Sequence, residues 1–348
     1  MEKNVGTGIL RHCVRFKVTR PPMETITLPA VTRVAVCGGT HGNELTGVHL
    51  VRELQKKEAK EPRKGGVSVV TVLSNPRAVQ QCRRYMDKDL NRCFTSALLS
   101  TPVVEDTPWE VARAQELNGL LGPKGSPSAM DLVCDLHNTT SNMGLCFISY
   151  SQCNWLSLHI FRHLQARAMS SIPMRYILLG VPPSEAYSLE SVGKCGFTIE
   201  AGPQPQGVLR ADIFNAVRDA VRHTLDWIRC FNAGAMFAGG EVEVYTMVKT
   251  LDFPRDPETH NITATIHPDL QDQDFCLLRP GDPLFLSLSG ETQRYEGEEP
   301  MYPLFVNEAA YYEKGIALWL ARCTKVAFPP VQVEAGAPGG PSDPEKDA

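Results

Sequence analysis

The sequence has no excess of positive charge, no long apolar run and no paired cysteine motif. Its formal net charge of -4 excludes a nucleic-acid-binding protein, because contact with phosphates needs a basic face. No segment approaches the roughly 20 consecutive apolar residues that span a bilayer. The N-terminus also lacks the apolar block of a secretory signal. The sequence leaves peripheral membrane association open without indicating it.

The cysteines lack the spacing of a disulfide framework. There are 11, an odd number, and none forms a CxxC pair. Several lie inside apolar runs such as Val34–Cys37 and Leu132–Leu136, where a free thiol behaves as a small core residue. This usage indicates a reducing compartment and predicts a cytoplasmic protein.

The 348 residues suit one large domain or two unequal ones, and both ends differ from the middle. Residues 1–22 are basic with almost no acid, which a transit peptide would also show. We interpret residues 1–30 as a disordered leader, with Met23 as an alternative start. Residues 329–348 are rich in Pro, Gly and acids, so we expect a disordered tail.

Residues 31–232 alternate between strand and helix patterns, which predicts an α/β domain whose sheet is covered on both faces. The expected strands are Arg33–Cys37, Val67–Leu73, Asp131–Leu136, Leu145–Tyr150 and Phe197–Glu200, and the expected helices are 45–54, Trp109–Leu121, Trp155–Ala166 and Gly207–Phe231. After a run rich in Gly and Ala, residues 241–326 read as a smaller β-rich domain with many turn dipeptides.

The segment Gly38–Glu44 (GGTHGNE) lies where a predicted strand meets a predicted helix. In a first helical turn, residues three apart lie on one side, so His41 and Glu44 are candidate zinc ligands. A nucleotide-binding loop fits less well, because GxGxxG is absent. Two ordinary surface residues at a helix start are the other alternative.

A third ligand should come from another strand end. His137 follows a buried apolar strand, in the polar segment Asp135–Thr140, although a histidine there can also be a hydrogen-bonded loop residue. Asp135 lies either on the opposite strand face or close enough to orient a ligand.

Glu200 ends an apolar strand and is a candidate general base for hydrolysis; a salt bridge to an arginine is the alternative. The polar segment Tyr85–Arg92 is a second candidate region. An Asn91–Arg92 pair can hold a carboxylate, and Arg84 can stabilise an oxyanion. Here the alternative is a solvated loop with internal ion pairs.

Six motifs in order resemble the aspartoacylase family of zinc carboxypeptidase-like hydrolases: GGTHGNELTGV, NPRAV…DLNR, DLHNTTSNMG, EAGPQPQGVLRAD, HPDLQDQD and VNEAAYYEK. The resemblance covers roughly Arg33–Lys325. It implies a mixed-sheet α/β hydrolase domain, with a smaller β-rich C-terminal domain that caps the cleft and limits it to small substrates.

The resemblance also implies roles for individual residues. One zinc ion per chain would be held by His41, Glu44 and His137, with Glu200 as general acid/base and Arg84 as the group that polarises the amide carbonyl. Further roles follow from the same motifs: Asn91 and Arg92 hold the α-carboxylate of the amino acid, Tyr311 reaches the site from the C-terminal domain, and Asp89 orients its neighbours.

One position departs from the family pattern. Aspartoacylase carries an arginine ten residues before the catalytic glutamate, for the second carboxylate of N-acetylaspartate, and this sequence has Glu190 there. An acid would repel a dianion. The resemblance is therefore greater to the branch that deacetylates N-acetyl aromatic amino acids and mercapturates (N-acetyl-S-substituted cysteines), unless Arg175 or Lys194 replaces the arginine.

Three alternatives stay open. Cleavage of N-acetylaspartate is the first, and a non-catalytic binding protein on the same fold is the second. A carboxypeptidase is less expected because the cap should exclude peptides. The expected partners are a small N-acyl amino acid and further copies of the chain, as a homo-oligomer (dimer or tetramer).

Overall fold

The computed structural model describes residues 23–58, 66–151, 154–167 and 172–335. Most of the predicted leader (residues 1–22) and most of the predicted tail (336–348) lie outside the described residues.

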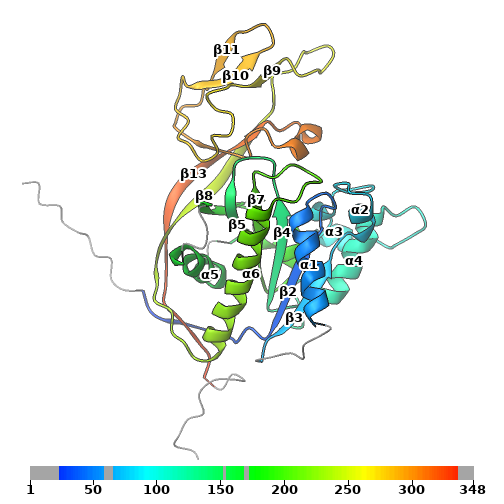
Figure 1. Cartoon of the computed structure of the whole chain (residues 1–348), viewed down its shortest axis with the longest axis vertical. Coiled ribbons are helices and arrows are strands. Elements are labelled where there is room, and N and C mark those ends of the chain that lie inside the picture. Colours follow the sequence, from blue (N-terminus) through cyan, green and yellow to red (C-terminus); the bar gives the residue numbers. More distant parts are fainter. Residues whose placement is uncertain (1–22, 59–65, 152–153, 168–171, 336–348) are drawn as a thin grey trace, which may run out of the picture.

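A nine-stranded mixed sheet forms the centre of the molecule (Figure 1). Its strands, from one edge to the other, are β12 (Tyr302–Leu304), β13 (Leu318–Phe328), β8 (Gly240–Leu251), β6 (Met174–Leu178), β5 (Gly144–Ser149), β7 (Cys195–Gly202), β4 (Leu132–Asn138), β2 (Arg33–Gly38) and β3 (Ser68–Leu73). The strands β7, β4, β2 and β3 are parallel to one another. The sheet changes direction between β7 and β5, which pair antiparallel.

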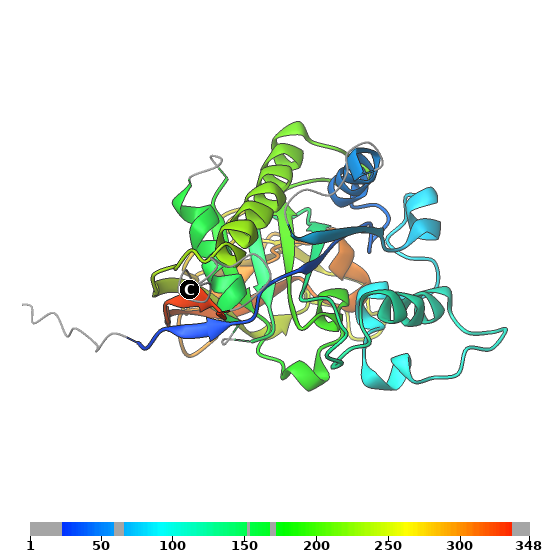
Figure 2. The same cartoon turned by 90° about the horizontal axis from the view of Figure 1, so that it is seen from below.

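Helices cover both faces of the sheet because alternate side chains of its inner strands are apolar on both sides. In β2, Val34 and Val36 join one buried cluster while Ala35 and Cys37 join another. The first cluster packs under α1 (Leu45–Glu58), α5 (Trp155–Ala166) and α6 (Ala211–Asn232), and the second under α4 (Trp109–Leu121). Figure 2 shows α6 and α4 on opposite sides of the strands.

The remaining helical segments are short, and several lie near the carboxyl ends of the parallel strands. They are α2 (Pro76–Gln80), α3 (Ser96–Leu99), η1 (Leu90–Arg92), η2 (Pro183–Glu185), η3 (Leu189–Val192) and η4 (Ala309–Lys314). The predicted strands and helices of residues 31–232 are confirmed in type. The strand β6 was not predicted, and α6 begins at Ala211 rather than at Gly207, whose φ of 70° breaks the helix.

The C-terminal segment is β-rich as predicted, but it is not separate from the central sheet. Its long strands β8 and β13 pair with each other, and β8 continues the sheet from β6. The small sheet of β9 (Ala264–Ile266), β10 (Pro283–Ser287) and β11 (Thr292–Arg294) stands beyond the far end of this ribbon, at the top of Figure 1.

The prediction that residues 1–30 and 329–348 are disordered is wrong in part. β1 (Ile26–Leu28), inside the predicted leader, pairs in parallel with β14 (Val331–Val333), inside the predicted tail. Val331 is fully buried in the core beneath α6, and this burial contributes to offsetting the entropy lost when both ends become ordered. Among the described residues, no helix combines the length and the apolar character needed to cross a membrane.

Candidate metal centre and active site

The three predicted zinc ligands come together at the carboxyl ends of β2 and β4. His41 and Glu44 lie in the turn between β2 and α1, and His137 is the penultimate residue of β4. The turn passes very close to α2: a Cβ atom on Gly42 would lie 2.1 Å from the backbone carbon of Ala78. Because Gly42 has no side chain, the turn that carries His41 can approach α2 this closely, and His41 is held near the end of β4.

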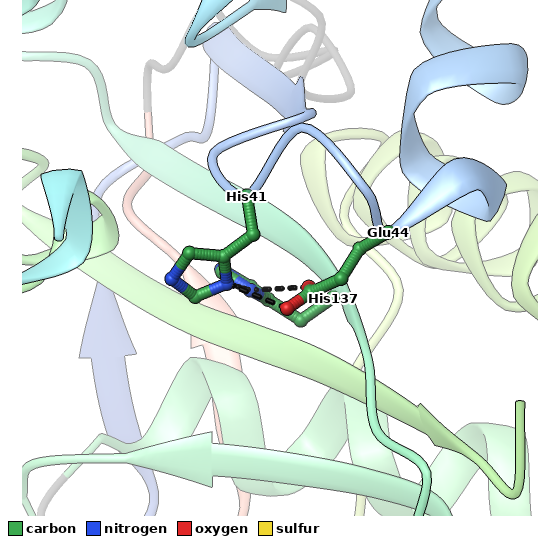
Figure 3. A group of neighbouring side chains, drawn as sticks. All are labelled: His41, Glu44 and His137. Atoms are coloured by element: carbon green, nitrogen blue, oxygen red, sulfur yellow. Dashed lines mark hydrogen bonds and ion pairs between the residues drawn. The ribbon is translucent and has the colours of Figure 1, made fainter. Parts of the chain in front are cut away.

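The ligand atoms of the three side chains face one another (Figure 3). Nδ1 of His41 lies 2.6 Å from one oxygen of Glu44, and Nδ1 of His137 lies 2.9 Å from the other. The two Nδ1 atoms are 3.1 Å apart. All three side chains are at most 5% exposed, so this polar cluster is shielded from water.

The other ring nitrogen of each histidine contacts a second carboxylate. Nε2 of His41 lies 3.0 Å from Asp89, and Nε2 of His137 lies 2.7 Å from Asp135. If each Nε2 donates its hydrogen to that carboxylate, both Nδ1 atoms present lone pairs toward Glu44. Three acceptors that converge without a proton fit a cation, and two imidazoles with one carboxylate are a donor set that zinc prefers.

The charges around the cluster lead to the same conclusion. Burial alone would raise the pKa of Glu44, but the two imidazoles hold that pKa well below its usual range. Burial lowers the pKa of His137, yet the Asp135 and Glu44 carboxylates outweigh burial and raise it well above its usual value. The site therefore favours positive charge among its carboxylates, which a divalent cation supplies.

Glu200 lies beside the cluster because β7 pairs in parallel with β4, with Glu200 opposite His137. Paired residues on parallel strands point to the same face of a sheet. Among the described residues, its carboxylate has no hydrogen-bond or ion-pair partner, so the predicted alternative of a salt bridge to an arginine is wrong. Burial and the neighbouring Glu44 carboxylate raise its pKa well above its usual value.

The segment between residues 84 and 92 approaches the cluster from the other side. Arg84 donates to Glu44 (3.1 Å) and lies 3.5 Å from Asp89, while its buried Nε atom has no partner in the part of the chain that the structure describes. Arg92 stacks over the ring of Tyr187 at 4.7 Å. Asn91 accepts a hydrogen bond from the backbone of residue 189 (3.0 Å). The alternative of a solvated loop with internal ion pairs is confirmed in part: Arg84 pairs with Asp89, and Asp87 and Lys88 are exposed, but Asp89 is buried and Arg84, Asn91 and Arg92 face the cavity.

Glu190 also faces this site. It is 2% exposed, and one carboxylate oxygen accepts a hydrogen bond from Ser188 (2.6 Å) while the other has no partner among the described residues. Burial raises its pKa. Neither candidate replacement for the missing arginine reaches the cavity: Lys194 pairs with Asp131 near the surface, and Arg175 lies over the ring of Phe275.

The C-terminal segment completes the wall of the site. Tyr311, in η4, is 8% exposed and stacks on Trp319, and burial raises its pKa far above the usual value of a tyrosine. Two further residues of the same motif were not predicted. Glu308 accepts hydrogen bonds from Thr139 and from the backbone of residue 140, and Lys314 lies 2.6 Å from Asp89.

These side chains surround a cavity of about 60 Å³. All predicted site residues except Asp89 line it: His41, Glu44, Arg84, Asn91, Arg92, His137, Glu190, Glu200 and Tyr311. Asp89 stands behind His41, as its predicted orienting role requires. A second cavity of about 370 Å³ shares only Tyr150 and Glu190 with the first. The arrangement offers a cation site, an unpaired carboxylate and two guanidinium groups around a small space, which suits hydrolysis of a small anionic substrate.

Comparison with family models gives two matches that together span most of the described chain. Residues 30–228 match the succinylglutamate desuccinylase/aspartoacylase catalytic domain, and residues 240–323 match the AstE/AspA barrel-sandwich hybrid domain.

Individual proteins are similar over nearly their whole length. N-acyl-aromatic-L-amino acid amidohydrolase (carboxylate-forming) A of Danio rerio is 58% identical over 90% of this chain and 95% of its own. Aspartoacylase of Rattus norvegicus is 46% identical over 86% of this chain and 94% of its own. The crystal structure of murine aminoacylase 3 superimposes with a TM-score of 0.84 at 44% identity, covering 88% of this chain and all of that one (100%).

Proposed function

Because the chain belongs to the succinylglutamate desuccinylase/aspartoacylase family, we propose that it is a zinc-dependent amidohydrolase of N-acyl aromatic amino acids and mercapturates. The observation that carries the proposal is the cluster of His41, Glu44 and His137 beside the unpaired carboxylate of Glu200. The 58% identity to an N-acyl-aromatic-L-amino acid amidohydrolase supports the substrate class. Mercapturates are included because they too join an N-acetyl group to a free carboxylate and an apolar side chain.

His41, Glu44 and His137 would hold the zinc ion, with Asp89 and Asp135 fixing the two imidazole rings. Bound there, zinc would supply the Lewis acidity that makes water a nucleophile near neutral pH.

Glu200 is the general base and then the general acid. Its carboxylate takes a proton from the attacking water and later delivers it to the nitrogen of the leaving amine. Two features support this role: the carboxylate has no competing partner among the described residues, and burial together with Glu44 raises its pKa, so that it can hold a proton between the two steps. Glu200 lies next to the metal site because it is paired with His137 across β7 and β4.

Arg84 stabilises the negative charge that develops on the carbonyl oxygen. Its guanidinium is anchored to Glu44 and Asp89 and lines the cavity, and its Nε–H has no partner among the described residues, so it is available to donate to an oxyanion. Arg92, with Asn91 beside it, binds the α-carboxylate of the substrate. Tyr311 stays protonated because burial raises its pKa, and its hydroxyl can donate a hydrogen bond to the acyl group.

Glu190 sets the preference for the side chain. When it is ionised, this buried carboxylate repels a second carboxylate on the substrate, so N-acetylaspartate should be a poor substrate. Cleavage of N-acetylaspartate remains the second candidate, supported by the 46% identity to an aspartoacylase. Assembly into a dimer or tetramer, a cytoplasmic location and a capping role for residues 241–326 remain predictions.

The test is amine release by the purified full-length chain from N-acetyl-S-benzylcysteine, N-acetyltyrosine and N-acetylaspartate, with and without a zinc chelator. We expect chelator-sensitive turnover of the first two and little of the third. Glu200→Gln should abolish turnover and retain zinc, while Glu243→Gln, an exposed residue on β8, should behave as wild type. No turnover of any substrate by folded, zinc-loaded protein would support a non-catalytic binding protein instead.

A further inference from the structure

A fully buried carboxylate that is not part of the catalytic cavity lies on the first turn of α4. Glu110 is 0% exposed and does not line the cavity, and among the described residues it forms no ion pair. A buried carboxylate is costly unless hydrogen bonds replace its hydration. The hydrogen-bond partners of Glu110 therefore indicate its structural role.

Four N–H groups converge on Glu110. One oxygen accepts from the backbone of Met86 (2.7 Å) and from the side chain of Asn75 (3.0 Å). The other accepts from the backbones of Asp87 and Lys88, both at 3.0 Å. A carboxylate accepts about four hydrogen bonds, so its capacity is filled. Three consecutive backbone amides that point at one place form a nest for an anion, and here the anion is a side chain.

The connection between α4 and this loop is reciprocal. Asp87 accepts a hydrogen bond from the backbone of Trp109, the first residue of α4 (2.8 Å). Asn75 extends the network toward the metal centre, because its backbone donates to Gly39 in the turn that carries His41 (3.1 Å). The loop is therefore held at once to α4 and to the turn that bears two metal ligands.

The three captured amides lie between the functional side chains of the loop. Arg84 precedes them by two residues, Asp89 follows at once, and Arg92 lies four residues after Lys88. A shift of residues 86–88 would displace the guanidinium that grips the substrate carboxylate and the carboxylate that orients His41. Misplacement by about 1 Å can cost on the order of 100-fold in rate.

We propose that Glu110 is a positioning residue: it sets the place of Arg84, Asp89 and Arg92 by binding the backbone of residues 86–88. This inference rests on the proposed function. Glu110 does not touch the substrate, and its effect is transmitted entirely through the loop.

The substitution Glu110→Gln tests this role, because glutamine keeps the shape and replaces one acceptor oxygen by an NH2 group. That group would face N–H donors, so part of the nest would lose its partner and the loop would shift. The matched control is Glu116→Gln on the same helix, where the side chain is 57% exposed and pairs with Arg113. A second variant, Asp87→Ala, breaks the reciprocal bond at an exposed position and leaves the buried carboxylate in place.

The readout is the ratio of kcat/KM for N-acetyltyrosine to that for its methyl ester, measured on zinc-loaded full-length protein. This ratio reports the grip on the free α-carboxylate, and a simple loss of stability would not change it. We expect Glu110→Gln to raise KM for the acid and lower the ratio about tenfold, with an effect of about threefold for Asp87→Ala and none for Glu116→Gln. Zinc content should stay near one per chain in all three.

An unchanged ratio in folded Glu110→Gln would overturn the proposal. If that variant does not fold, Asp87→Ala tests the attachment of the loop to α4 from the other side, and an unchanged ratio there, against the expected threefold loss, would overturn the proposal. Inactivity of the wild-type chain on both substrates would overturn the proposed function itself, before any variant is compared.

Discussion

The substitution Glu190→Gln should relax the discrimination against N-acetylaspartate. Glutamine has the same shape and keeps an oxygen to accept the hydrogen bond from Ser188, so the wall of the cavity should be preserved. The change removes only the charge that Glu190 carries when ionised. It therefore isolates the electrostatic part of the side-chain preference.

The expected size of the effect can be estimated from the electrostatic repulsion between Glu190 and a second carboxylate of the substrate. Glu190 lines the same cavity as Arg92 and Glu200, so we take roughly 6 Å as the distance between its carboxylate and a second carboxylate of the substrate. At roughly 6 Å and an effective dielectric constant of about 20, two unit charges repel by about 3 kcal/mol. Partial protonation reduces this value, because burial raises the pKa of Glu190. We expect about 1.4 to 2.7 kcal/mol, which is about 10- to 100-fold in kcat/KM.

The assay compares kcat/KM for N-acetylaspartate with that for N-acetyltyrosine in both proteins at several pH values. In the wild type the discrimination should weaken as the pH is lowered through the raised pKa of Glu190, since the protonated carboxyl no longer repels a dianion. In Glu190→Gln the ratio should not follow this titration. The control is Glu185→Gln, an exposed residue that does not line the cavity. Equal ratios in wild type and Glu190→Gln at alkaline pH would refute the electrostatic argument.

Three further outcomes are expected. Removal of metal by a chelator should lower the Tm of the protein, and added zinc should restore it. An ion that binds only the folded state stabilises it by about 4 kcal/mol when the free ion concentration is about 1,000 times the Kd. An unchanged Tm in scanning calorimetry would contradict a structural contribution of the ion. Burial raises the pKa of Asp274 to about 7, so its contribution to stability is present below pH 4 and is lost as the pH rises toward 7. Urea unfolding should therefore show the wild type losing stability relative to Asp274→Asn over that range, by at most about 1.4 kcal/mol per pH unit, and parallel profiles would argue against this titration. Gly42→Ala should lower the free energy of unfolding by about 1–3 kcal/mol and weaken zinc binding, because the added Cβ would meet the backbone of Ala78. If a competition assay with a chelator gave the wild-type zinc affinity, the turn would be able to relax around the added methyl group.

Much of the fold could be predicted from periodicity, because the inner elements bury regular apolar patterns. The helix Trp109–Leu121 has the predicted bounds, with Val111, Ala114 and Leu117 buried on one face. The strand Met174–Leu178 was missed, since a single run of five residues with a charged side chain gives no clear alternation. The pairing of β1 with β14 could not be predicted either, because it joins segments at opposite ends of the chain and depends on the burial of Val331.

The metal ligands could be predicted because their chemistry is local. His41 and Glu44 are three residues apart, and His137 lies at the end of a strand of clear pattern. The contacts that support them are not local. Lys314 reaches Asp89 across 225 residues, and Glu308 reaches Thr139 across 169. No periodicity or spacing encodes such a pair, so the sequence suggests a role for Asp89 without its partner Lys314 and does not single out Glu308 at all.

The position of Asp89 explains why the C-terminal segment belongs to the active site. Its carboxylate is buried and contacts three groups from three parts of the chain: His41 after the first inner strand, Arg84 in its own loop and Lys314 in η4. Burial alone would raise its pKa, but the His41 imidazole foremost, together with the Arg84 and Arg92 guanidinium groups, lowers that pKa far below its usual value and keeps Asp89 ionised. An ionised Asp89 can hold the Nε2 hydrogen of His41 and so direct Nδ1 toward the metal site. The N-terminal half supplies the ligands, and docking of residues 309–314 completes both the charge balance behind them and the wall of the cavity in front.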